Sequence, residues 1–323
     1  MDMTSNLSQI LEQLVIVKDV NGSAYLVEWD FNGIGDLEIG QGYQIKTTEE
    51  VPLEIVGDYT FPQDYPISLS AGWNMIGYLR TEPANASSVL FELNSQGNLI
   101  IVKDYLGAAY LPEWNFNGIG DMIPGRGYQL KTFNEGVLEY LENDLEYRLG
   151  DIEFTDNQVS HFERMVPTDN NMTMVIDDGS WDNLPQKGSE ISAYDEFGKM
   201  VGSGSYTSPV TVLTVWGDDL MTSERDGLSA SEEISFKLWD TEVIRDFTIP
   251  KWSQGSSYYH VDAVNVAYLV ETGVESSIID NTDFYLVKVI NVLGQEVDMN
   301  TKSYSSEILF KVYSDGSVEK VIH

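Results

Sequence analysis

The chain has 323 residues, 42 % of them hydrophobic and 11 % aromatic, which indicates buried cores rather than a disordered polymer. Its formal net charge of −34, from 52 acidic and 18 basic residues, argues against nucleic acid as a partner because a polyanion repels phosphate. The absence of cysteine excludes disulfides and thiolate chemistry, and no apolar run approaches the roughly 18 residues of a membrane helix, so we expect no membrane span.

An internal repeat organises the first half of the chain. Residues 14–47 (LVIVKDVNGSAYLVEWDFNGIGDLEIGQGYQIKT) align without a gap with residues 99–132 (LIIVKDYLGAAYLPEWNFNGIGDMIPGRGYQLKT), and most positions are identical. Each copy has the β-branched runs and glycine-containing turns that predict short strands. We therefore expect the two copies to be a duplication and to share one fold.

A short helix is expected ahead of each copy. Before the second helix, residues 67–80 alternate like a strand around Trp73, and the first copy has no room for such a segment. We infer that Met1 is not the natural start of the parent protein. The first repeat should then have an open sheet edge. A neighbouring chain could fill this edge, or a homo-oligomer could form through it. The residues that can cap the two helices are Thr4, Ser5, Ser87 and Ser88.

Tryptophans can stack on sugars or fill cores. Trp29 and Phe31 recur at positions 114 and 116, and their spacing of two places both rings on one sheet face. We assign that face to the core of each repeat. Trp181 and Trp252 lie in polar, loop-like surroundings, and they are the candidate ligand-binding residues.

The sequence changes character near residue 147, where short alternating runs separated by turns predict an Ig-like antiparallel β-sandwich. A largely polar linker begins at residue 275. The expected fold is mainly β: tandem β-rich repeats with one short helix each, the sandwich, and a small C-terminal β-domain. The expected domains are residues 1–57, 58–146, 147–274 and 275–323.

One acidic loop is the candidate metal site. Its carboxylates fall between Gly217 and Gly227, and carboxylate oxygens suit Ca²⁺, which takes six to eight oxygen ligands. The spacing does not match an EF-hand, and a solvated acidic loop is the alternative reading. Calcium is the one candidate cofactor. The candidate ligands are Asp218, Asp219, Glu224 and Asp226.

Enzyme motifs are missing from the sequence. The three histidines, at positions 161, 260 and 323, are scattered, and there is no metal-binding HExxH. Gly202-Ser203-Gly204-Ser205 is not a nucleophile elbow of the G-x-S-x-G type. We predict no enzymatic activity.

The C-terminal segment carries a family likeness. It contains NVLGQEV at residues 291–297 and DGSVEKV at residues 315–321. It resembles the C-terminal sorting domain of proteins exported by the type IX secretion system of Bacteroidetes-type bacteria, with a plain terminal β-hairpin as the alternative. The resemblance implies a small β-sandwich that the secretion machinery recognises. The matching positions are Gly294, Gln295, Glu296, Asp315, Gly316 and Lys320.

The repeats and the middle module, with GSEISAYDEFGKMVGSG and SFKLWD, resemble non-catalytic segments of large secreted proteins in the same bacteria. We therefore predict an adhesive protein, extracellular or on the outer cell surface, that contacts glycans or other surface proteins. Two alternatives stay open: a virion surface or fibre protein built from the same modules, and the accessory C-terminal part of a secreted hydrolase.

Overall fold

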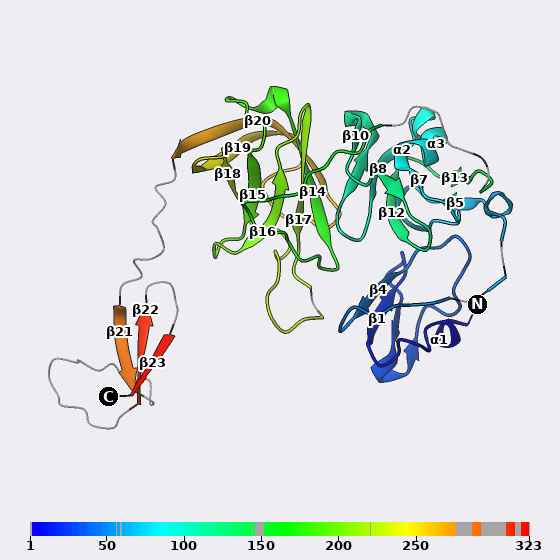
Figure 1. Cartoon of the computed structure of the whole chain (residues 1–323), viewed down its shortest axis with the longest axis horizontal. Coiled ribbons are helices and arrows are strands. Elements are labelled where there is room, and N and C mark those ends of the chain that lie inside the picture. The colour runs from blue at the N-terminus through cyan, green and yellow to red at the C-terminus, as the bar shows by residue number, and fades with distance from the viewer. Residues whose placement is uncertain are drawn as a thin grey trace. The chain divides into compact units, whose positions relative to one another are not determined.

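The computed structural model describes residues 2–55, 57–58, 60–143, 145, 152–219, 221–275, 286–291, 308–313 and 318–322. The protein is mainly β with a few short helices, as the sequence predicted (Figure 1). It divides into two compact units, Met1–Val274 and Glu275–His323. Within the described ranges, no helix has the length and apolar character needed to cross a membrane.

The first repeat is a four-stranded antiparallel sheet, in the order β3-β2-β1-β4, with one helical turn packed against it. Its core joins Met3, Leu7 and Ile10 to Val17 and Tyr25 of the sheet. The elements are α1 (Met3–Asn6), β1 (Leu14–Lys18), β2 (Ala24–Leu26), the 3-10 turn η1 (Val27–Trp29), β3 (Phe31–Asn32) and β4 (Gln44–Thr47).

The second repeat has a five-stranded sheet in the order β10-β9-β8-β12-β6, flanked by the two-stranded pairs β11-β7 and β13-β5. Its separate core packs the helical segment under the sheet. The elements are η2 (Pro62–Asp64), β5 (Ile67–Leu69), β6 (Gly72–Gly77), β7 (Ala84–Asn85), α2 (Ala86–Val89), α3 (Phe91–Ser95), β8 (Leu99–Lys103), β9 (Ala109–Leu111), η3 (Pro112–Trp114), β10 (Phe116–Asn117), β11 (Asp121–Met122), β12 (Gly127–Thr132) and β13 (Gly136–Leu138).

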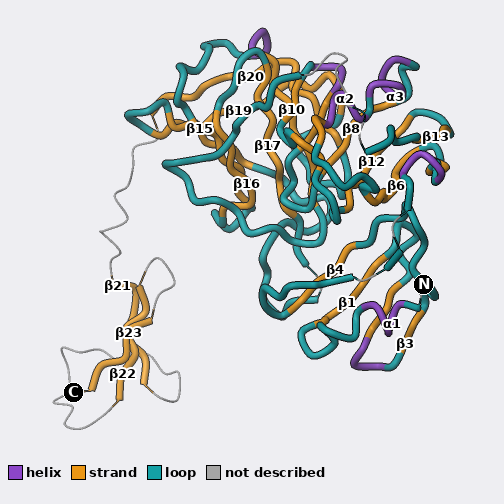
Figure 2. The backbone as a smooth tube through the Cα atoms, turned by 45° about the vertical axis from the view of Figure 1, so that its right-hand side comes forward, coloured by secondary structure: helices purple, strands orange, loops and turns teal. Residues whose placement is uncertain are grey.

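Strand pairing is the same in the two repeats, residue for residue. Val17 pairs with Tyr25 and Val102 with Tyr110, and Lys18 faces Gln44 as Lys103 faces Gln129. Each sheet also has one irregularity at the same place in its β1–β4 or β8–β12 ladder. The second repeat differs in having β6, which extends its sheet beyond β12. Figure 2 shows the strands of the two repeats as separate groups.

Helix capping differs from the prediction. Asp2 caps α1 by accepting a hydrogen bond from the Ser5 N–H, and Asn85 caps α2 by accepting one from the Ser87 N–H. Each cap lies at least two residues before the predicted serine or threonine. The short Asp and Asn side chains reach the unpaired N–H groups of the first turn, which satisfies donors that the helix itself leaves open.

The middle module is a seven-stranded sheet in the order β16-β15-β18-β19-β20-β14-β17, with β14 and β20 parallel. Its end strands approach so closely that a Cβ on Gly202 would lie 2.6 Å from the Thr214 carbonyl oxygen, so only glycine fits there. The elements are β14 (Asn171–Asp177), η4 (Asp178–Ser180), β15 (Glu190–Tyr194), β16 (Met200–Ser205), β17 (Val210–Trp216), β18 (Ser235–Trp239), β19 (Ile244–Gln254) and β20 (Val264–Glu275).

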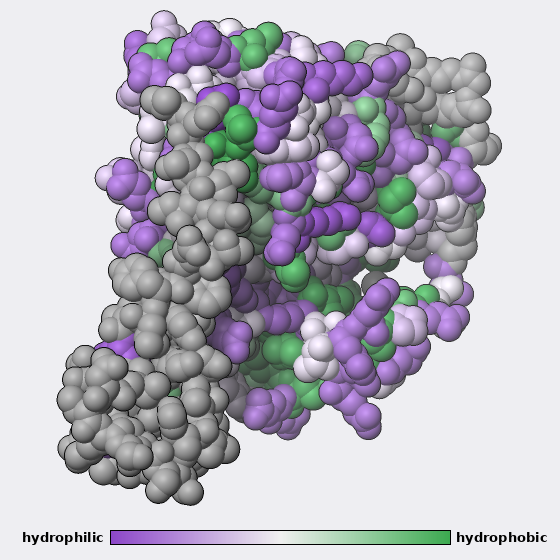
Figure 3. Space-filling model, turned by 60° about the vertical axis from the view of Figure 1, so that its left-hand side comes forward, coloured by the Kyte–Doolittle hydropathy of each residue, from purple (hydrophilic) through white to green (hydrophobic). Residues whose placement is uncertain are grey.

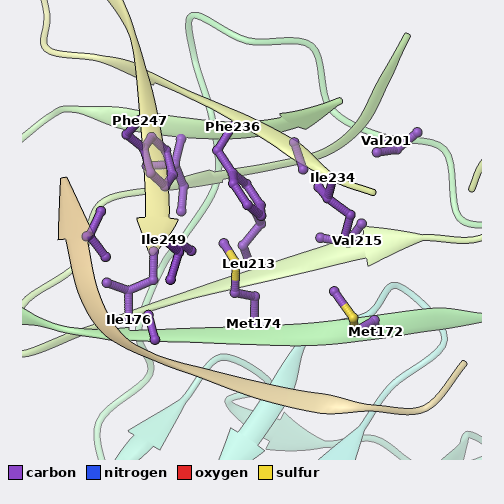
Figure 4. Packing of buried hydrophobic residues seen from close by; sticks show 14 of the residues in the cluster. Met172, Met174, Ile176, Val201, Leu213, Val215, Ile234, Phe236, Phe247 and Ile249 are labelled. Atoms are coloured by element: carbon purple, nitrogen blue, oxygen red, sulfur yellow. The ribbon is translucent and has the colours of Figure 1, made fainter. Parts of the chain in front are cut away.

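The core of this module lies inside the curled sheet, between opposed halves of its inner face. Figure 4 shows Phe236 and Ile249 reaching toward Met174 across it. All three side chains are buried, and Met174 is fully enclosed. The arrangement is sandwich-like, as predicted, because the sheet curls so that two halves of its apolar inner face cover each other.

The second unit contains a three-stranded antiparallel sheet in the order β21-β22-β23. Lys320 of the sorting-like motif lies on β23, opposite Phe310. The other motif positions, residues 294–296 and 315–316, lie outside the described residues. The strands are β21 (Leu286–Asn291), β22 (Ile308–Tyr313) and β23 (Val318–Ile322).

A buried carboxylate anchors the entry of the chain into the middle module. Glu190 is 2 % exposed, and it accepts hydrogen bonds from the backbone N–H groups of Ser160, His161 and Phe162 at 2.7–3.0 Å. Burial alone raises the pKa of Glu190, but these N–H groups, with the Ser160 hydroxyl, hold the pKa below its ordinary value. The carboxylate therefore stabilises the fold in its ionised form.

We predict that Glu190→Gln lowers the free energy of unfolding at neutral pH by about 2 kcal/mol, because an amide cannot accept all these hydrogen bonds. A lowered folded-state pKa gives stability that is present above the unfolded value of 4.5 and is lost as pH falls through the folded value. Denaturant unfolding at several pH values should show that the difference in unfolding free energy between wild type and Glu190→Gln becomes smaller below pH 4.5. Exposed Glu242→Gln is the control, and a difference that stays constant with pH would contradict the prediction.

Candidate functional site

The second repeat docks on the middle module through an apolar face. Leu111 and Phe116 pack in one buried cluster with Val175, Val210 and Val212. Trp114 is partly buried against the same cluster. The aromatic pair at positions 114 and 116 therefore contributes to a contact between modules, not to the core of its own repeat.

A buried lysine lies beside this contact. Lys103 is 1 % exposed, its Nζ donates to Asp262 at 2.8 Å and to Asn171 at 3.0 Å, and it lies 4.5 Å from the centroid of the Trp73 ring. Burial lowers the pKa of Lys103, and the Asp262 carboxylate opposes that change. The hydrogen bonds and the ring compensate for the cost of placing this ammonium away from water.

Two lysines of the first repeat reach the same module. The Lys18 ammonium pairs with Asp169 at 2.6 Å, and Lys46 pairs with Asp219, which is 4 % exposed. Burial raises the pKa of Asp219, but the Lys46 ammonium and the Met221 N–H hold it below its ordinary value. Ion pairs thus join the first repeat to the middle module, whereas apolar packing joins the second together with the Lys103–Asp262 ion pair.

A cleft of about 660 Å³, which we call the inter-module cleft, lies where the three modules meet. Its walls are β1 and residues 42–47 of the first repeat, residues 103–105 and 126–129 of the second, and residues 166–169 and Asp219 of the middle module. The rings of Tyr43, Tyr105, Tyr128 and Trp216 line it among charged side chains.

At one end of the cleft the two repeats are joined edge to edge. The Gly42 N–H donates to the Met75 carbonyl at 3.1 Å, and the Gly77 N–H donates to the Gly40 carbonyl at 2.9 Å. A Cβ on Gly42 would lie 2.7 Å from the Ile76 carbonyl oxygen, so this approach requires glycine. Among the described residues, no further backbone hydrogen bond continues this pairing between β4 and β6.

The predicted calcium loop is closed by its own carboxylates. Asp218 accepts the Asp226 N–H at 2.8 Å, and Asp226 accepts the Asp219 N–H at 2.8 Å and the Thr222 hydroxyl at 3.1 Å. Asp219 is also paired with Lys46, and Glu224 is exposed. In the described part of the chain no three acidic or histidine side chains gather as a metal site. The aspartates of this loop thus accept hydrogen bonds that close it, and calcium binding there stays a prediction.

The predicted ligand-binding tryptophans are in the middle module's core or against it. Trp181 is 8 % exposed, and its ring centroid lies 5.3 Å from that of Phe247, so it offers no open face and the prediction is wrong for it. Trp252 packs partly buried against the same core, and its indole N–H donates to the Ser257 hydroxyl at 3.2 Å. The sequence around both residues is typical of loops. In the structure, however, Trp252 lies on β19 and Trp181 directly follows η4, and both rings pack on the apolar interior of the module.

Among the described residues, the tryptophan that is exposed lies instead in the first repeat. Trp29 is 71 % exposed and Phe31 is 52 % exposed, whereas Phe116, the copy of Phe31, is 3 % exposed. The assignment of this pair to the core of the repeat is therefore wrong. We call Trp29 and Phe31 the aromatic face. The two copies have nearly the same residues at these positions, so the local sequence carries no signal for their difference in exposure.

Polar side chains surround the aromatic face. Glu28, Asp30 and Asn32 are exposed and alternate with the two rings along the chain. Figure 3 shows that the face of the molecule it displays is mainly hydrophilic, with hydrophobic residues in small separate groups. Both rings are exposed and only Asp30 separates them in the chain, so this segment is a candidate contact surface.

No family model matches the chain, and no curated protein or solved structure matches it.

We predict that Asp226→Ala lowers the melting temperature by the same amount with millimolar Ca²⁺ and with a chelator. The reason is that the Asp226 carboxylate holds the loop through the Asp219 N–H and the Thr222 hydroxyl, which should contribute about 1–2 kcal/mol. Glu224→Ala is the control and should melt like wild type. Calcium that raises the melting temperature of wild type but not of Asp226→Ala would support a metal site in this loop instead.

Proposed function

We propose that this chain is a non-catalytic adhesive protein of the outer cell surface, and that it contacts glycans through the aromatic face of Trp29 and Phe31. The observation that carries the proposal is the exposure of Trp29, 71 %, at a position whose copy is packed against another module. Removing a large aromatic ring from water is favourable, so an exposed ring favours binding to a target that covers it.

The chemistry around the rings favours a neutral glycan. The flat face of an indole can stack on the apolar face of a sugar ring, and the neighbouring Glu28, Asp30 and Asn32 supply acceptors for sugar hydroxyls. An anionic glycan would meet these carboxylates and a chain of net charge −34. Neutral sugars meet no such repulsion.

The non-catalytic part of the proposal is supported by how polar groups are engaged. His161 stacks on Trp239 with ring centroids 4.0 Å apart and planes 5° apart. The buried Glu190 carboxylate accepts hydrogen bonds from backbone N–H groups, and Asp218 and Asp226 accept the N–H groups that close their own loop. These groups serve the fold, so they are not free for acid or base chemistry.

Export by a type IX-like route is the proposed way to the surface. Its support is the resemblance of the C-terminal segment to sorting domains, together with the division of the chain at Glu275. A sorting domain has to be recognised as a unit of its own. The three antiparallel strands β21, β22 and β23 are compatible with that role.

We predict that Trp29→Ala weakens binding to a neutral polysaccharide at least about tenfold, because truncating an aromatic anchor costs about 2 kcal/mol. Binding is measured by affinity electrophoresis through gels that contain mannan, xylan, dextran or a soluble β-glucan. Phe133→Ala is the matched control, because Phe133 is also exposed, 60 %, but lies in the second repeat.

Retardation of wild type and of Phe133→Ala, with loss in Trp29→Ala, supports the proposal. Equal migration of all three proteins in every gel, or equal retardation of wild type and Trp29→Ala, counts against it. An unchanged melting temperature for Trp29→Ala is expected because the ring is exposed.

A further inference from the structure

The first repeat lacks a strand that the second repeat possesses. In the second repeat, β12 pairs with β8 on one side and with β6 on the other, over a ladder from Gly127–Gly77 to Thr132–Gly72. In the first repeat, β4 pairs with β1 and is the last strand of its sheet among the described residues. The outer backbone groups of β4 therefore form an open edge.

The open edge has almost the same sequence as the occupied one. Residues 42–47 read GYQIKT and residues 127–132 read GYQLKT. The inner ladders have the same register, so corresponding backbone groups of β4 and β12 point outward. A strand that fits β12 therefore has the right hydrogen-bonding pattern for β4.

The side chains that hold β6 in place are also duplicated. The Nζ atoms of Lys103 and Lys131 lie 4.5 Å and 5.3 Å from the centroid of the Trp73 ring on β6. Their copies in the first repeat are Lys18 and Lys46, and both line the inter-module cleft. The first repeat thus retains the two cations of the clamp without the ring.

The inter-module cleft supplies room beside this edge. Residues 43–47 form part of its wall, and its volume is about 660 Å³. The Gly42 N–H is already bonded to Met75, so an incoming strand would pair with β4 from Tyr43 to Thr47. Lys18 and Lys46 are partly exposed, 29 % and 31 %, so they remain within reach of a ring.

We propose that the outer edge of β4 accepts one extended polypeptide strand of the β6 type, supplied by another polypeptide. The strand runs antiparallel to β4 and completes the sheet. It carries an aromatic residue that lies against Lys18 and Lys46, with small residues at its ends, as in Gly72-Trp73-Asn74-Met75-Ile76-Gly77. Main-chain hydrogen bonds provide binding, and the cation–π contacts select the aromatic. This site is separate from the aromatic face, so it does not depend on the proposed glycan contact.

The test uses the full chain and a labelled peptide of residues 70–79, SAGWNMIGYL. Fluorescence anisotropy should show saturable one-to-one binding. Two control peptides should bind at least tenfold more weakly: one with Trp73→Ala, and one with N-methyl groups on alternate amides that face β4. The first loses the ring and the second loses the ladder. Absence of binding by the parent peptide, or equal binding by the controls, overturns the proposal.

Matched protein variants locate the peptide. The double variant Lys18→Gln, Lys46→Gln should lose at least tenfold in affinity, whereas Lys237→Gln, which removes a cation over Tyr194 in the middle module, should bind like wild type. A photoreactive group at the Trp73 position of the peptide should crosslink to the first repeat. Crosslinking to β12 instead would show exchange with the chain's own β6 and would overturn the proposal. Circular dichroism and melting check that each variant is folded.

Discussion

The contact between the second repeat and the middle module is the constraint on which the rest of this structure depends. Phe116 and Leu111 bury against Val175, Val210 and Val212, and Lys103 reaches Asp262 at the margin of that cluster. Burial of apolar area drives the contact, roughly 25 cal/mol for each Å² removed from water. This contact covers the aromatic pair of the second repeat, whereas the pair of the first repeat stays in solvent.

Charge then decides how the first repeat is held. The chain has few bases and many acids, yet Lys18 and Lys46 both pair with aspartates of the middle module. Ion pairs that are partly exposed contribute little and are weakened by salt. The first repeat is therefore attached less firmly than the second, by ion pairs and by the short Gly42–Met75 edge contact, and a cleft remains between them. Its two exceptional features, the open β4 edge and the exposed Trp29, arise from this asymmetry.

The local sequence pattern predicted the strands and their pairing well, but it predicted the burial and the contacts of individual side chains poorly. The gapless repeat correctly predicted one pairing scheme for both copies, since register follows from alternation and turn position. Polar neighbours wrongly placed Trp181 at the surface, because the sheet curls over that segment. Clustered acids did not reveal that Asp218 and Asp226 close their loop, because side-chain-to-backbone hydrogen bonds within a loop cannot be recognised from composition.

By itself, the sequence determined the mainly β character and the shared strand pairing of the two repeats, because strand propensity and repeat register are local properties. The tertiary structure alone decided which aromatic pair is buried and which lysines face acids across modules. It also decided that the β4 edge borders a cleft. Two copies with nearly identical sequences have different exposure because burial depends on what lies opposite a residue, and that partner is distant in the chain.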